Sequence, residues 1–299
     1  MQPAASFPFP IIRSIAVVPL LALLWSPSQG SATPLLGPNL TGFAVLGAST
    51  VTNTGATTIN GNVGVAPGTA ITGAGTISIT GTYRSGIDPV GIAAQSELVS
   101  ALTHLGGLGP GTTLPADLAG LVLSPGVYTV PAGVSNLTGT VTLNGQGNAN
   151  AGWVFLMPST FITSPGSVVR VINTGAGAGI YWDVGSSATL DTTTSFAGNI
   201  LAPASITLNH AASIGCGRAL AETAAVTMDN NTINAADCLG SAGAGTNGYA
   251  GGLDVVGSTV SFLPFSDVPE PGSLALLAVA LGLLTVVSRR RDVLGDDLT

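Results

Sequence analysis

One short pattern of threonine and β-branched residues occurs several times in this chain, and it restricts the possible folds more than any other feature. The stretch STVTNTGATTINGNVGV at residues 49–65 aligns without a gap on ASITLNHAASIGCGRAL at residues 204–220. In this alignment several apolar residues of the first stretch fall on apolar residues of the second, and several hydroxyl residues fall on hydroxyl residues. Thr52 falls on Thr207. Internal repetition of this kind indicates a structural unit that stacks on copies of itself.

Further copies give the period of the unit. SATLDTTTSFAGNILA places Thr189 on Thr207, and AVTMDNNTI places Thr227 there, so the unit recurs from position 189 to 207 and again from 207 to 227. A period of about 20 residues is typical of one turn of a three-sided β-helix, with a short strand on each side. A fourth copy, TGTVTLNG, puts Thr142 at the same position.

Strand geometry predicts which residues of the unit face outward. Successive side chains of a strand point to opposite sides, so Ile206 and Leu208 are expected inside, and Ser205 and Thr207 outside. Stacked coils lie about 4.7–4.9 Å apart, so the copies predict two columns of hydroxyl and methyl groups on a flat, uncharged face. The predicted positions are Thr50, Thr52, Ser135, Thr142, Ser187, Thr189, Ser205, Thr207, Ala225 and Thr227.

Charge is scarce in this chain. It has seven arginines, no lysine and fourteen acidic residues, so that 7% of the residues are charged, whereas a typical globular protein has about 25%. So few cations cannot neutralise many phosphates, which argues against nucleic acid as a partner. The 42 glycines and 19 prolines, with runs of Val, Thr and Ile between them, favour many short strands and tight turns.

Residues 1–30 have the organisation of a secretory signal peptide. Arg13 precedes the apolar run SIAVVPLLALLW, and the small residues behind it offer signal peptidase a cleavage site near Gly30. We therefore expect this segment to be removed when the protein is exported.

Residues 268–299 contain the motif Pro269-Glu270-Pro271, followed by an apolar run at 274–287 and by three consecutive arginines. In this order the three features resemble the PEP-CTERM sorting signal of Gram-negative bacteria. A plain C-terminal membrane anchor is the simpler interpretation, because the arginines suit the cytoplasmic face. The resemblance implies instead that a helix is anchored transiently in the inner membrane, that an exosortase cuts near the motif, and that the body reaches the cell surface or the extracellular space.

In the remaining body, residues 31–267, one helix is predicted at about 88–105. Asp88 is a suitable N-cap, and Pro89 suits the first helical position. One side of the segment is apolar, so the helix should lie against another part of the protein. The apolar residues are Ala94, Leu98, Ala101, Leu102 and Leu105.

Several longer motifs follow one another along the body, namely FAVLGASTVTNTGATTINGNVGVAPGTAITG (residues 43–73), LSPGVYTV, NAGWVFLM, YWDVGSSATLDTTTSFAGNILAPASITLN and GRALAETAAVTMDNNTI. In this order they resemble motifs of the microbial ice-binding proteins that fold as a discontinuous β-solenoid. The resemblance covers essentially the whole body. It implies a mostly β fold, namely a right-handed, three-sided solenoid of triangular section with one long α-helix packed alongside.

The resemblance also implies a function, the adsorption of a flat Thr/Ser-rich side to ice, with inhibition of ice growth and recrystallisation outside the cell. A threonine column is equally what a soluble β-rich exterior would contain, because threonine is favoured in strands. The alternative is therefore a structural or adhesive matrix protein without affinity for ice. A second polar surface, less regular in sequence, comprises residues 55–58, 192–195 and 210–213.

Residues able to support catalysis or metal binding are sparse. Parallel β-helices can host polysaccharide-cleaving enzymes, which need clustered carboxylates, and the nearest candidates are Asp183, Asp191 and Asp229. Asp191 and Asp229 share a repeat position at a turn, where Asp commonly bonds the local backbone. His104 and His210 are too few for a zinc site. We expect neither an enzyme nor a bound metal or other cofactor.

Two cysteines, Cys216 and Cys238, complete the set of notable residues. An even cysteine count in an exported protein favours a disulfide, and the separation of positions 216 and 238 is close to one coil. Adjacent coils fall within the Cα separation of about 4.4–6.8 Å that a disulfide requires. Two buried thiols are the alternative.

Overall fold

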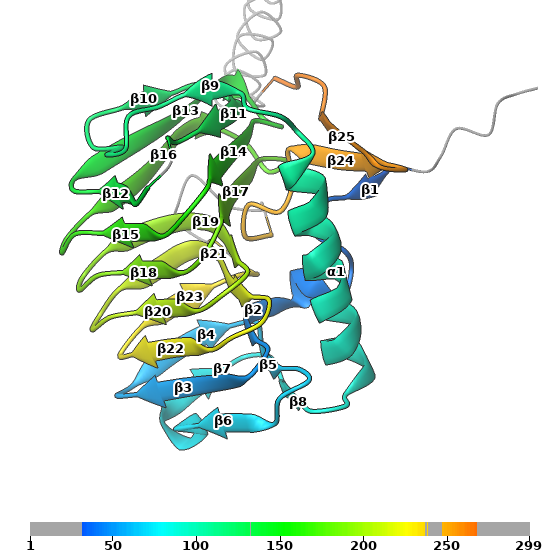
Figure 1. The fold of residues 1–299 in the computed structure, drawn as a ribbon, viewed down its shortest axis with the longest axis vertical. Coiled ribbons are helices and arrows are strands. Elements are labelled where there is room, and N and C mark those ends of the chain that lie inside the picture. Colours follow the sequence, from blue (N-terminus) through cyan, green and yellow to red (C-terminus); the bar gives the residue numbers. More distant parts are fainter. Residues whose placement is uncertain (1–31, 132, 237, 239–246, 268–299) are drawn as a thin grey trace, which may run out of the picture. The chain divides into compact units, whose positions relative to one another are not determined.

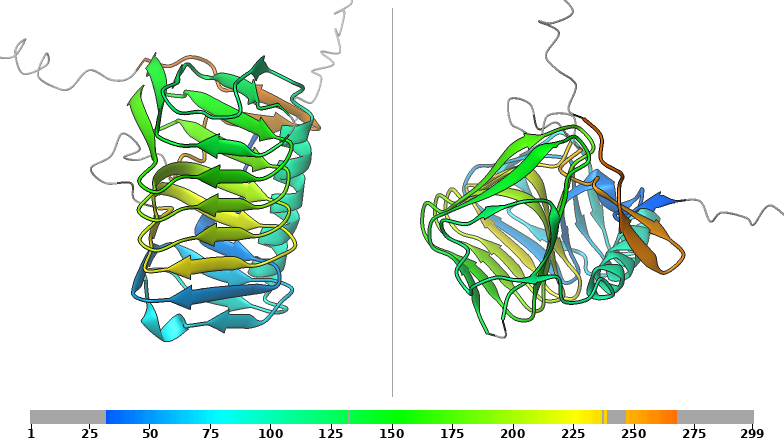
Figure 2. Two further views of the ribbon diagram at one scale, coloured as in Figure 1. Left: turned by 60° about the vertical axis from the view of Figure 1, so that its left-hand side comes forward. Right: turned by 90° about the horizontal axis from the view of Figure 1, so that it is seen from above.

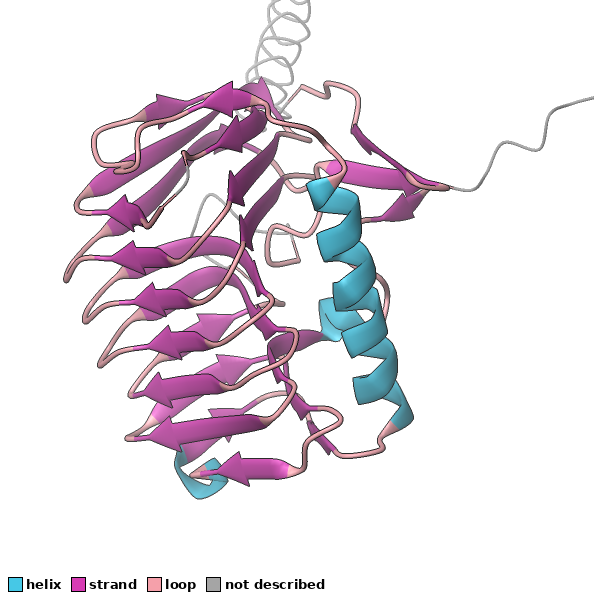
Figure 3. Ribbon diagram, in the orientation of Figure 1, coloured by secondary structure: helices cyan, strands magenta, loops and turns pink. Residues whose placement is uncertain are grey.

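A computed structural model describes residues 32–131, 133–236, 238 and 247–267 (Figure 1). The predicted signal peptide, the Pro-Glu-Pro motif and the apolar run behind it lie outside these residues. Within the described part, strands predominate beside one long helix (Figure 3). The prediction of a mostly β fold with a single long helix is confirmed.

The smaller of the two large sheets has seven parallel strands. In spatial order they are β12 (Ser135–Leu137), β15 (Phe161–Thr163), β18 (Ala188–Leu190), β20 (Ile206–Leu208), β22 (Val226–Asp229), β3 (Thr50–Thr54) and β6 (Ala70–Thr72). Each strand pairs with the next without a register shift.

The larger sheet has fifteen strands, which pair in two ladders. The first ladder contains β7 (Ile77–Ile79), β4 (Thr57–Asn60), β23 (Thr232–Asn234), β21 (Ser213–Ala221), β19 (Ser195–Ala202), β16 (Val168–Thr174), β13 (Thr140–Asn148) and β10 (Val122–Leu123). The second ladder contains β8 (Tyr83–Ser85), β5 (Asn62–Val65), β2 (Phe43–Gly47), β17 (Gly179–Val184), β14 (Gly152–Met157), β11 (Gly126–Thr129) and β9 (Thr112–Thr113). β19 and β21 are long enough to join both ladders.

The paired strands stack the chain into successive coils (Figure 2). Residues that point into the coils form one continuous apolar core, in which aromatic rings lie on consecutive rungs. Phe155 and Trp182 stack with their ring centroids 4.0 Å apart, and Phe161 and Phe196 extend the cluster. The coiled β architecture is thus as predicted, whereas its right-handed sense and triangular section stay predictions.

The coils do not follow one another in chain order. β22, late in the chain, pairs with β3, near its start, and Thr227 lies opposite Thr52. β21 and β23 pair in the same way with β2 and β4. We call this junction of late and early coils the seam, which is visible in Figure 1 where yellow strands lie beside blue ones.

Arg218, on β21, links several segments at the seam. Its side chain is fully buried, and it donates hydrogen bonds to oxygen atoms on separate parts of the chain. The acceptors are the carbonyl oxygens of Thr41 (2.7 Å), Ala235 (3.2 Å), Asn247 (3.0 Å) and Gly248 (3.2 Å), and the side-chain oxygens Oδ1 of Asn199 (2.9 Å) and Asn247 (3.3 Å). None of these acceptors is a carboxylate. Burial lowers the pKa of Arg218 to about 10, so the guanidinium stays charged at neutral pH.

The long helix, α1 (Pro89–Gly106), begins where the sequence predicts. Asp88 caps it by accepting hydrogen bonds from the backbone N–H groups of Val90 and Gly91, each at 3.0 Å. The apolar side of the helix packs on outward residues of the second ladder, among them Val154, and on Leu201 in the part of β19 that pairs with this ladder. The helix therefore covers this side of the solenoid (Figures 2 and 3). No helix among the described residues is both long and apolar enough to cross a membrane.

Three short strands form a separate antiparallel sheet beside the helix: β1 (Thr33–Pro34), β24 (Leu253–Val256) and β25 (Thr259–Phe262). Two 3₁₀ turns, η1 (Leu40–Gly42) and η2 (Ala74–Thr76), complete the elements. The structure joins Cys216 to Cys238 in a disulfide, with the two Cα atoms 5.3 Å apart, within the range that the coil spacing predicts.

Candidate functional site

Threonines form a straight column on the outer side of the seven-stranded sheet. In spatial order they are Thr189, Thr207, Thr227, Thr52 and Thr72, each opposite the next. The residues that flank the first four of them, such as Ile206 and Leu208 beside Thr207, are buried in the core, and Ile71 beside Thr72 is partly buried. Strand alternation therefore turns these threonines away from the core, at a spacing of about 4.7–4.9 Å from one rung to the next.

A second column runs parallel to the first, two residues earlier on each strand. It contains Ser187, Ser205, Ala225, Thr50 and Ala70. The hydroxyls of Ser187 and Ser205 lie 3.1 Å apart and share a hydrogen bond. Residues two apart in a strand are separated by about 6.6–6.8 Å, which sets the distance between the columns.

Beyond Ser187 and Thr189, both columns continue onto the last two rungs, β15 and β12, through residues that the sequence did not predict. Asn136 and Ile162 continue the threonine column, since Asn136 pairs with Ile162 and Ile162 with Thr189. Thr160 and Val134 continue the second column. We call the outward side of these seven strands, with its two columns, the seven-stranded face. The two columns consist of hydroxyls, methyls and a single amide, without charge, and the acidic Asp229 lies at the end of β22, two residues beyond Thr227.

Two of the predicted positions do not belong to this face. Ser135 is fully buried and pairs with Phe161, so it lies in the core row and not in an outward column. Thr142 lies on β13 of the larger sheet, opposite Val122 and Arg170. The prediction that these two residues join the array is wrong, because the first coils are longer than the others. The steps from position 136 to 162 and from 162 to 189 both exceed the repeat steps from 189 to 207 and from 207 to 227.

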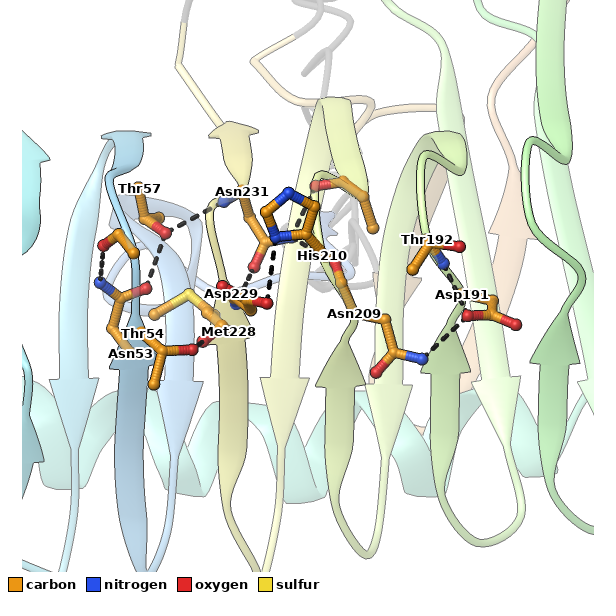
Figure 4. Close-up of polar contacts among 12 residues, drawn as sticks. Asn53, Thr54, Thr57, Asp191, Thr192, Asn209, His210, Met228, Asp229 and Asn231 are labelled. Carbon is orange, nitrogen blue, oxygen red and sulfur yellow. Dashed lines mark hydrogen bonds and ion pairs between the residues drawn. The ribbon is translucent and has the colours of Figure 1, made fainter.

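Polar side chains reinforce the corner beside the seven-stranded face (Figure 4). The Asp191 carboxylate accepts hydrogen bonds from the Asn209 side-chain amide at 3.0 Å and from the Thr192 N–H at 2.7 Å, and these hold its pKa below the usual range. On the next rung, His210 and Asp229 form a pair at 3.1 Å. Such contacts fix consecutive rungs relative to each other at the edge of the columns.

Inside the same corner, buried side chains bond from rung to rung. The Asn231 amide donates to the carbonyl oxygens of Asn209 and Ala212, at 2.9 and 2.8 Å. The Thr57 hydroxyl donates to Asn53 Oδ1 at 2.6 Å and accepts from the Asn231 N–H at 3.0 Å, across the seam. The early and late parts of the face are therefore held in one register by hydrogen bonds (Figure 4).

The predicted second polar surface is only partly found on one side. Thr58, Ser195 and Ser213 lie on the first ladder of the larger sheet, in a hydroxyl row with Ser78 and Thr232. The preceding residues of the same stretches, among them Thr57, Thr192 and His210, lie at the corner described above. This surface is less regular than the seven-stranded face, because the register shifts between Phe196 and Ala197 and the exposed Arg170 adds a charge.

The candidate catalytic residues do not form a cluster. Asp183 lies on β17 of the second ladder, in a hollow near the C-terminal end of α1 that Leu156 and Met157 also line. Burial raises its pKa to about 6. Asp191 and Asp229 lie instead at the corner of the seven-stranded face, and the described residues contain no group of three or more His, Cys, Asp or Glu that could hold a metal ion.

The face and its scaffold have counterparts among known proteins. Residues 45–234 match the model of the Ice-binding-like family. The chain belongs to this family. An ice-binding protein of Nostoc sp. (strain HG1) is 41% identical over 208 residues, which cover 69% of this chain and 76% of the relative. An ice-binding protein of Flavobacterium frigoris (strain PS1) is 31% identical over 216 residues, covering 64% and 72%.

Solved structures of ice-binding proteins share the fold. The crystal structure of an ice-binding protein from an Antarctic biological consortium superposes with a TM-score of 0.64 at 36% identity, covering 68% of this chain and 91% of that one. Residues 267–291 match the PEP-CTERM protein-sorting motif, which implies export to the surface or the extracellular space. The family resemblance and the sorting signal that the sequence analysis identified are both confirmed.

Proposed function

We propose that this protein binds ice through the seven-stranded face and thereby inhibits ice growth and recrystallisation. The observation that carries the proposal is the unbroken register of seven parallel strands, whose two outward columns carry short, uncharged side chains. Of the two ladders of the larger sheet, the second is covered by α1, and the first has a register shift and the exposed Arg170. Relatives of 41% and 31% identity are named ice-binding proteins, which supports the same function.

The physical reason lies in the surface that ice presents. Ice is a rigid lattice of oxygens, so a protein can hold it by ordering waters on an equally rigid and flat surface. Threonine suits this role because its branched Cβ already restricts χ1, so little side-chain entropy is lost on adsorption. Charged groups would retain hydration shells that do not match the lattice. Neighbouring methyls and hydroxyls can instead exclude disordered water and hydrogen-bond to ordered water.

Ice-affinity partition tests the proposal. A slowly growing ice hemisphere should take up the mature protein and exclude serum albumin added to the same solution. A protein that stays in the liquid together with albumin would refute ice binding and favour the structural or adhesive matrix protein instead. Because no step of this function forms or breaks a covalent bond, we infer that the protein is not an enzyme.

The chain ends support a route to the site of action. We infer that signal peptidase removes residues 1–30, that the apolar run 274–287 anchors the protein transiently in the inner membrane of a Gram-negative bacterium, and that an exosortase cuts near Pro269-Glu270-Pro271. Intact-mass measurement of the surface form should give a C-terminus near Val268. A mass that includes residues 274–287 would refute the cleavage.

A further inference from the structure

Asp183 is a charged residue that the proposed function does not use. It lies on β17 in an outward row of the second ladder, in which Thr129 and Leu156 occupy the two rungs before it. The inward neighbours of this row, such as Trp182, lie in the core. On the other side of Asp183 the row continues through Leu201, which α1 covers. The helix ends beside β14 and β17, so the row leaves the cover of the helix at Asp183 (Figure 1).

A hollow of about 450 Å³ opens where the helix stops covering this row. Its apolar walls are formed by Leu156, Met157 and Pro158 at the end of β14 and by Pro110 in the segment that follows α1. Among the described residues that line it, only Asp183 is charged. Sites for small molecules commonly have volumes of about 300–1,000 Å³, with mostly apolar walls and a few polar groups. The hollow therefore has the size and composition of a small-molecule site.

Two polar groups in this hollow have no partner within the described part of the chain. Burial raises the pKa of Asp183, and no N–H or hydroxyl group there donates to its carboxylate. The Thr129 hydroxyl oxygen is shielded from solvent and also makes no hydrogen bond. The Glu97 carboxylate, by contrast, accepts hydrogen bonds from the Asn39 side chain and the Leu40 N–H, each at 2.7 Å. Because a half-buried carboxylate without a partner costs free energy, such groups occur preferentially at functional sites.

No cationic side chain in the described part of the chain is placed to neutralise Asp183. The protein has no lysine. Arg84 is paired at the start of α1, Arg218 is buried at the seam, and Arg170 lies on β16 of the first ladder. His104, in the last turn of α1, lines a different hollow. The negative end of the helix dipole borders the hollow of Asp183 and also favours a cation. A positive charge at this site must therefore come from a ligand.

We propose that this hollow binds a small organic cation, namely an ammonium group on a short apolar stem. The ammonium group donates hydrogen bonds to the Asp183 carboxylate, and the stem packs on Leu156 and Met157. Thr129 lies two rungs from Asp183, about 9–10 Å away, so its hydroxyl can bond a second polar group at the far end of the stem. The site is separate from the seven-stranded face, because it lies on the second ladder, which α1 partly covers.

Titration calorimetry of the purified protein at neutral pH tests this site. The probe is aminopentanol, which has an amine at one end of its stem and a hydroxyl at the other. The control ligand is pentanediol, in which a hydroxyl replaces the amine. Asp183→Asn removes the charge and keeps the shape of the side chain. The matched control is Asp254→Asn, because Asp254 lines another largely apolar hollow, of about 370 Å³, beside β24.

We expect the parent and Asp254→Asn to bind aminopentanol with a Kd in the millimolar range. Asp183→Asn should bind it about 10- to 100-fold more weakly, the loss expected for a hydrogen bond to a charged group, and the parent should bind pentanediol more weakly by a similar factor. Three results would each refute the site: no binding of aminopentanol by the parent, equal affinity for the two ligands, or unchanged affinity in Asp183→Asn. Equal weakening in Asp254→Asn would show only a general attraction to an acidic protein and would refute it as well.

Discussion

Replacing the buried Arg218 by lysine should loosen the seam without removing the positive charge. The guanidinium donates to six oxygen atoms, whereas a lysine ammonium has three hydrogens to donate. About three acceptors would therefore lose their donor. Each buried acceptor left without a partner costs about 1–3 kcal/mol. Three fully buried acceptors would amount to about 3–9 kcal/mol, but the acceptors on Thr41 and Asn247 are only partly buried. We therefore expect Arg218→Lys to lower the free energy of unfolding by about 3–6 kcal/mol, a large share of the roughly 5–15 kcal/mol typical of a folded domain.

Calorimetry at neutral pH gives the measurement. For a body of this size a loss of about 3–6 kcal/mol should lower Tm by about 10–20 °C. Arg170→Lys is the matched control, because Arg170 is exposed on β16 and should leave Tm unchanged. If Arg218→Lys melts together with the parent and the control, the hydrogen bonds of Arg218 do not hold the seam.

Two further predictions concern Asp183 and the disulfide. The folded-state pKa of Asp183, about 6, lies above its ordinary value of 3.8, so stability is greatest while the carboxyl is protonated and falls as pH rises from about 4 to about 6. Asp183→Asn should therefore raise the free energy of unfolding by about 1–3 kcal/mol at pH 7 and by nothing below pH ~4. Urea titrations of the parent and the variant at the two pH values measure this. If the two proteins differ in stability by the same amount at both pH values, the charge of Asp183 is not buried. Thiol titration of the native, non-reduced protein should recover neither Cys216 nor Cys238, and recovery of both thiols would rule out the disulfide. Reduction should lower the free energy of unfolding by about 3 kcal/mol, as expected for a closed loop of this length.

Local signals predicted the helix and the centre of the face. Asp88 and Pro89 act within one turn of the helix start, so their pattern is independent of the rest of the fold. The repeat steps likewise predicted that Thr189, Thr207 and Thr227 lie opposite one another, because those coils have nearly equal lengths.

Other features were beyond the reach of the repeat. Ser135 and Thr142 were misplaced because the first coils contain additional residues, which a fixed period cannot show. Thr72 was missed although it pairs directly with Thr52, since its strand AIT has three residues and Gly73 follows it directly. Extending the repeat that begins at residues 49–65 by one further coil would have indicated Thr72.

The role of Arg218 has no signature in the sequence. Most of its acceptors are backbone carbonyls, which every residue carries, and they come from segments that are distant along the chain. Only the pairing of late coils with early ones brings Thr41 close to Asn247 around one guanidinium. The seam is a tertiary feature, and its contacts follow from the fold and not from local pattern.

Crystal shaping by Thr207→Tyr tests most directly whether the seven-stranded face binds ice. Thr207 lies between Thr189 and Thr227 in the middle of the column, so a tyrosine there should hold the face off the lattice. An outward strand substitution should change stability by no more than about 0.5 kcal/mol, so lost activity could not be attributed to unfolding. The control is Ser213→Tyr, on the second polar surface. We predict that the parent and Ser213→Tyr shape ice into facets while Thr207→Tyr leaves round discs. Facets with a folded Thr207→Tyr and discs with Ser213→Tyr would show that ice binds to the other face.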